Sequence, residues 1–74
     1  MAMTPLQRKV AFRSRAELAG LTLAGAAHEI CGVTWEHLSE GIAGKRTLSA
    51  DVKQKFAAFV GQSMKSVFGD AVAA

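Results

Sequence analysis

Cysteine, proline and long apolar runs are all scarce in this chain of 74 residues. Because Cys31 is the single cysteine, no disulfide can form within the chain, and nothing in the sequence indicates an oxidising compartment. No apolar run approaches the roughly 20 residues that span a bilayer, and residues 1–6 lack the apolar segment of a signal peptide. We therefore expect a soluble, cytoplasmic protein with no membrane contact.

Residue patterns typical of enzymes and metal sites are also missing. No nucleophile, base and orienting group stand at a recognisable spacing, and no glycine-rich phosphate loop occurs. His28, Cys31 and His37 suggest zinc, but three ligands are too few for a closed structural site, and their spacing matches no zinc finger. The sequence predicts no catalytic residue, no metal and no cofactor, and it predicts that Cys31 is a small buried hydrophobic residue.

The composition fits one small domain with a modest positive charge. Nine basic and six acidic residues give a formal charge of +3, which permits binding to a polyanion. Half of the residues are hydrophobic, yet a domain of this length buries only about 60% of its unfolded surface. A partner subunit is therefore expected.

Helix start and stop signals recur along the chain, and no alternating strand pattern is present. Thr4 followed by Pro5 predicts the start of a first helix that ends near Gly20, because the first helical position does not need the amide proton that proline lacks. Leu6 and Val10 share one face of this helix. We expect them to enter the core together with Ala11, Ala16 and Leu18.

Two more helices follow, separated by a short turn. The first covers about residues 22–31, beginning at Thr22 and ending at Gly32, where glycine permits a positive φ angle. The second covers about residues 34–42 and begins at Thr34.

The remaining residues predict one longer helix and one short one. Ser49 caps a fourth helix with an apolar stripe at helical spacing. A fifth short helix lies within residues 62–70, and residues 71–74 form a frayed tail. The sequence thus predicts a single all-α domain over residues 1–70, a compact bundle of four or five short helices.

The segment from Gly32 to Ser49 combines several features at a defined spacing. Gly32-Val33 makes a turn and Thr34 opens a helix; Leu38-Ser39, the loop Gly44-Lys45-Arg46 and Ser49 follow. Over residues 21–61 this spacing closely resembles the Cro and lambda-repressor-like helix-turn-helix family. The resemblance implies a DNA-binding transcriptional regulator of the phage, plasmid or bacterial type, with residues 34–42 as its recognition helix. His28 departs from the family, which usually has a small residue there, and Glu40 stands where a basic or polar residue is common.

The resemblance also implies which residues contact DNA. A recognition helix held by a short turn inserts its N-terminal side chains into a major groove about 12 Å wide. The expected base contacts are Thr34, Trp35, Glu36, His37 and Glu40. The expected phosphate contacts are Ser39, Lys45, Arg46, Thr47, Arg13 and Arg15. Two alternatives stay open, since Trp35 can instead belong to a core, and the basic residues of the first helix can form an ordinary solvated face.

The apolar residues of the C-terminal part exceed what one small core needs. We expect the excess to form a homodimer interface of Phe59, Met64, Val67 and Phe68. Two copies of the recognition helix would then face half-sites one helical turn apart, so the target is an inverted repeat.

Glu36 and Glu40 favour a second interpretation. Negative charge on the recognition helix opposes phosphate binding, so the helix-turn-helix can instead serve as a protein-interaction module that binds a protein partner through its acidic helix. Under the DNA interpretation, Glu36 accepts a hydrogen bond from a cytosine amino group.

Overall fold

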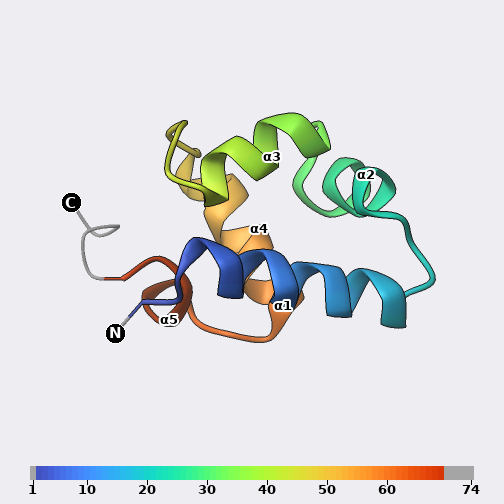
Figure 1. The fold of residues 1–74 in the computed structure, drawn as a ribbon, viewed down its shortest axis with the longest axis horizontal. Helices are drawn as coiled ribbons and strands as arrows, with labels where there is room; N and C mark the ends of the chain where they lie inside the picture. Colours follow the sequence, from blue (N-terminus) through green and yellow to red (C-terminus); the bar gives the residue numbers. More distant parts are fainter. Residues whose placement is uncertain (1, 70–74) are drawn as a thin grey trace.

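Six helical segments make up residues 2–69, the part of the chain that the computed structural model describes (Figure 1). The segments are α1 (Pro5–Leu18), α2 (Leu23–Ala26), the π-helical turn η1 (Ala27–Cys31), α3 (Trp35–Ile42), α4 (Ala50–Val60) and α5 (Met64–Phe68). No strand occurs within residues 2–69, so the all-α prediction is confirmed. The predicted tail 71–74 lies outside the described residues.

Short side-chain caps define where the helices begin. Before each α-helix, a Ser or Thr oxygen accepts a hydrogen bond from the backbone amide three residues on, at 3.0–3.2 Å. These caps are Thr4, Thr22, Thr34, Ser49 and Ser63. The four caps predicted from the sequence are confirmed, because a cap depends only on residues within one helical turn.

Phe12 of α1 lies at the centre of the core and is fully buried. Its ring stacks on Phe56 of α4, with centroids 5.2 Å apart, and on Trp35 of α3 at 5.8 Å. Phe59 meets the same ring edge-on at 5.3 Å. One aromatic side chain therefore joins α1, α3 and α4, and aromatic pairs of this kind add stability beyond the area that they bury.

The prediction for the inner face of α1 was wrong in part. Leu6, Val10 and Leu18 were expected in the core, but their exposed fractions are 70%, 53% and 81%. The buried residues of α1 are Phe12 and Ala16. Phe12 lies on the inner face because its ring packs against three other aromatic rings. This packing contributes more than burial of the smaller aliphatic side chains would.

The middle of the chain places α3 on the outside of the bundle. The helical stretch formed by α2 and η1 ends at Gly32, which adopts a left-handed conformation with φ of 70°. Only Gly32, Val33 and Thr34 separate it from α3. In Figure 1, α3 runs alongside α1, while α4 lies behind them. Leu38 and Ile42 face the core, as predicted, and leave the other side of α3 for the site.

Candidate nucleic-acid interface

The N-terminal end of α3 is held by the turn that precedes it. Thr34 adopts an extended conformation, and its hydroxyl oxygen accepts a hydrogen bond from the His37 amide at 3.1 Å. The Val33 amide donates back to the carbonyl of Ala27 at 3.3 Å. Both ends of the turn are therefore tied to a helix, which gives α3 a defined orientation.

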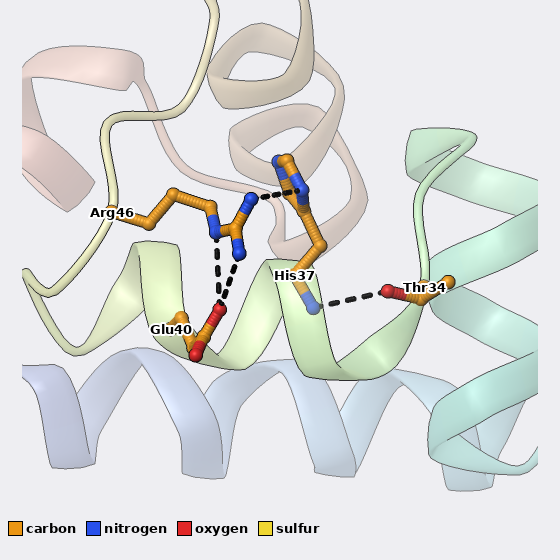
Figure 2. Close-up of polar contacts among 4 residues, drawn as sticks. All are labelled: Thr34, His37, Glu40 and Arg46. Carbon is orange, nitrogen blue, oxygen red and sulfur yellow. Dashed lines mark hydrogen bonds and ion pairs between the residues drawn. The ribbon is translucent and has the colours of Figure 1, made fainter.

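Three predicted contact residues form one hydrogen-bonded network on α3 (Figure 2). Arg46, from the loop after α3, donates from Nε and Nη2 to one oxygen of Glu40, at 3.0 and 2.8 Å. Its Nη1 lies 3.2 Å from Nδ1 of His37. Because a guanidinium group has only donors, Nδ1 accepts, and the proton of the neutral imidazole is on Nε2. The network sets both the ring orientation and the tautomer of His37.

This network changes the charge that α3 presents. Arg46 and Glu40 are half-exposed and form an ion pair, so their charges cancel locally. The negative charge of Glu40 therefore opposes phosphate binding less than its place in the sequence suggested, and Arg46 is less free to hold a phosphate. Glu36 is exposed on the first turn, and Lys45 is exposed on the loop.

Trp35 lies partly within the core. Its ring stacks on Phe12 and is half-buried against the packed residues. This position corresponds to the alternative that the sequence left open, because the ring face toward Phe12 packs in the interior. Thr34, Glu36 and His37 are the predicted base contacts that lie nearest the exposed N-terminal end of α3.

The loop after α3 is anchored by a residue that sequence analysis did not single out. Leu48 is only 3% exposed, although it lies in the loop between α3 and α4. A methyl group on Gly41 would lie 2.2 Å from Cδ2 of Leu48, so the glycine makes room for this anchor. Lys45 and Thr47 remain exposed on the loop, and Ser39 is half-buried on α3. These three stay predicted phosphate contacts.

The structure does not bring Arg13 and Arg15 together. Both are exposed, but residues two apart on an α-helix project about 200° from each other. Nη2 of Arg15 lies only 2.7 Å from the position that a Cβ on Gly61 would take, so Arg15 stands over the C-terminal end of α4. At most one of the two can face a backbone held along α3.

Arg8 is another basic residue of the first helix, and the structure gives it partners inside the bundle. Its Nε donates to the carbonyl of Val67 at 2.9 Å, and its Nη1 donates to the carbonyl of Ile42 at 3.0 Å. Its guanidinium group also lies 5.0 Å from the ring centroid of Phe68. Desolvation by burial lowers the pKa of Arg8. The sequence contained one signal for this inward position. Arg8 stands four residues before Phe12, which puts both side chains on one side of α1.

The predicted dimer interface is corrected at Val67, which is fully buried in the core. A side chain with no exposed surface cannot contact a second copy. Phe59 packs on Phe12, and Phe68 packs on Phe56 with centroids 5.7 Å apart, so both contribute to the interior of one chain. Met64 is also half-buried against the core.

Cys31 is buried, as predicted, with 3% of its surface exposed. Desolvation raises the pKa of its thiol, and the nearby positive charge of Lys55 opposes that change in part. Within residues 2–69, no three side chains of the His, Cys, Asp or Glu type come together in a way that would hold a metal ion. No helix in the same range is long and apolar enough to cross a membrane.

Neither a protein-family model, nor a curated protein, nor a solved structure matches this chain.

Proposed function

We propose that this protein is a sequence-specific DNA-binding transcriptional regulator that inserts α3 into the major groove. The observation that carries the proposal is the setting of α3. It begins after a three-residue turn, is capped by Thr34, buries Leu38 and Ile42, and keeps Glu36 exposed and His37 partly exposed. A helix presented in this way fits a groove about 12 Å wide, and its N-terminal side chains reach base edges first.

The side chains near that end can discriminate bases. Glu36 accepts hydrogen bonds only, which suits the amino group of cytosine. His37 donates from Nε2 to an acceptor such as N7 or O6 of guanine, because Arg46 already occupies Nδ1. Glu40 and Arg46 then act as the pair that holds His37 in place.

The phosphate contacts come from residues on or next to the loop that follows α3. Lys45, Thr47 and Ser39 lie on or next to the loop at the C-terminal end of α3, and a single phosphate contact there sets the register of the helix in the groove. We further propose that the protein binds an inverted repeat as a homodimer, which presents two copies of α3 one helical turn apart.

The test is selection from a random duplex library at low and physiological salt, followed by fluorescence anisotropy on the enriched sequence. We expect His37→Ala to change base preference at one position, and Lys45→Ala to weaken binding to all sequences and reduce the salt slope by about 1. Lys9→Ala is the matched control, since it removes the same charge from an exposed site on α1. A library with no enriched sequence would contradict the proposal.

A protein partner is the second candidate function, and the ion pair between Arg46 and Glu40 favours it. Because the charge of Arg46 is paired with that of Glu40, it does not offset the negative charge of Glu36, which is exposed on the first turn of α3. Glu36→Lys separates the two functions. It raises nonspecific DNA affinity if α3 binds DNA, because it replaces a repelling charge with an attracting one. It weakens capture of a basic protein partner if α3 binds protein.

A further inference from the structure

A hollow of about 260 Å³ lies between the N-terminal half of α1, the loop after α3, α4 and α5. Its lining comprises Arg8, Gly41, Gly44, Arg46, Thr47, Leu48, Lys53 and Phe68. Three of these side chains are cationic, none is acidic, and they come from three different parts of the chain. One water molecule takes up only about 30 Å³ of liquid, so the hollow has room for a larger group.

Two of the cations, Arg8 and Lys53, lie near the aromatic ring of Phe68. The guanidinium carbon of Arg8 lies 5.0 Å from the ring centroid of Phe68, and Nζ of Lys53 lies 5.6 Å from the same centroid. A ring face attracts a cation, and Phe68 lies within reach of both positive charges. Both cations also line the hollow, so an anion bound there is attracted by both.

The position of Arg8 is set before any ligand arrives. Its hydrogen bonds to the carbonyls of Val67 and Ile42 hold the guanidinium group at the meeting point of α1, α3 and α5. A donor that is already ordered loses little conformational freedom on binding. Arg46 also lines the hollow, but its charge is paired with that of Glu40 and its Nη1 contacts His37.

We propose that this hollow binds one oxyanion of the phosphate class, held by Arg8 and Lys53, while Arg46 stays paired with Glu40. Guanidinium and ammonium groups are the side chains that bind phosphate oxygens most strongly. Two sources supply this chemistry: a free phosphate or phosphate monoester, and a backbone phosphate of a nucleic acid. The site needs no base recognition by α3, so it does not depend on the proposed regulatory function.

The first test uses inorganic phosphate alone, added to the full chain at constant ionic strength with chloride as the reference. Amide resonances from residues 41–48 and 53 should shift and saturate, as measured by heteronuclear NMR. We expect Lys53→Gln to weaken phosphate affinity about tenfold, which corresponds to the loss of one charge-assisted contact.

Lys55→Gln is the matched control. It removes the same charge from α4, but Lys55 projects about 200° from Lys53 around the helix and pairs with Asp51. Phosphate affinity should be unchanged in this variant. Lys53 is a better probe than Arg8, whose loss also removes two hydrogen bonds within the fold. Shifts that do not saturate, that spread over all basic residues, or that weaken equally in both variants would overturn the proposal.

The second test distinguishes the two sources. Displacement of bound phosphate by duplexes of any sequence would assign the hollow to a backbone phosphate. Simultaneous binding of phosphate and duplex would assign it to a free anion. Saturable phosphate binding together with no duplex binding at all would support the oxyanion site while contradicting the proposed DNA-binding function, so the two failures are separable.

Discussion

Arg8 joins three helices through one guanidinium group. Carbonyls at the ends of α3 and α5 have no partner within their own helices, and Arg8 donates to both. A side chain that fills this role contributes to folding even though it carries a full charge near the surface.

We expect Arg8→Ala to lower the free energy of unfolding by about 2–3 kcal/mol, because two hydrogen bonds from a charged group are lost and two carbonyls are left without a donor. Urea denaturation followed by circular dichroism measures this change. Arg8→Lys should recover little of it, since one ammonium group does not reproduce the fork geometry of Nε and Nη1. Lys9→Ala, at an exposed neighbouring position, should cost less than 0.5 kcal/mol by comparison.

Cys31 provides a second prediction for a single residue. Burial raises the pKa of its thiol from the ordinary value of about 9, so the folded chain keeps this proton at a pH where the unfolded chain loses it. The stability that the neutral thiol contributes is fully present below the unfolded pKa and is lost as pH rises above it. In wild type, stability should therefore fall above about pH 9. Cys31→Ala should remove that part of the pH dependence.

The same burial should slow thiol chemistry. We expect Cys31 to react with a thiol reagent at pH 8 many times more slowly in the folded chain than in urea. Equal rates in the two states would show that the α2–η1 segment opens easily, contrary to the burial of Cys31 in the core.

At the scale of elements, the approach of α3 to the loop that follows it depends on Gly41. This residue lies inside α3, where alanine normally stabilises a helix. Here an added methyl group would meet Cγ of Leu48 at 2.3 Å and Cδ2 at 2.2 Å. Because these atoms are near the branch point of a buried side chain, the clash cannot be relieved by moving a flexible end.

Gly41→Ala is therefore expected to destabilise the fold by about 1–3 kcal/mol, as overpacking of a core does. Thermal unfolding measures the effect. Ala43→Gly, next to the end of α3, makes the opposite change at an exposed site and should have a smaller effect. A stabilised Gly41→Ala variant would show that Leu48 is not packed against α3 and would remove the anchor that we assign to the loop.

At the scale of the whole molecule, the core of one chain takes up most of the apolar residues that the sequence assigns to a dimer interface. Val67 is fully buried, and Phe59 and Phe68 pack on rings of α1 and α4. The large apolar side chains left exposed within residues 2–69 are Leu6, Val10 and Leu18, all on α1. The proposal of a homodimer therefore does not rest on the interface predicted from the sequence.

Val67→Asp tests this assignment directly. A carboxylate placed in the core without a partner should cost several kcal/mol and unfold a domain of this size. Circular dichroism should show loss of helix, and sedimentation should show an expanded chain. A folded, monomeric Val67→Asp protein would instead mean that Val67 lies at a subunit interface.

The sequence alone determined where the helices begin and how they are joined. Thr4, Thr22, Thr34 and Ser49 each cap a helix through a contact only three residues long, and Gly32 ends one through its own backbone freedom. Such features depend on local chemistry, so they were readable without knowing which helices meet. The position of α3 after a short turn, and hence the candidate site, was readable for the same reason.

Only the tertiary structure decided which faces and charges are available. It buried Phe12 in place of Leu6 and Val10, set Val67 in the core, and gave Arg8 and Arg46 their partners. The hydrogen bonds of Arg8 span 34 and 59 residues of sequence, and the burial of Phe12 depends on rings from α3 and α4. Burial and ion pairing are set by what comes near a side chain in space, and spacing along one helix does not contain that information.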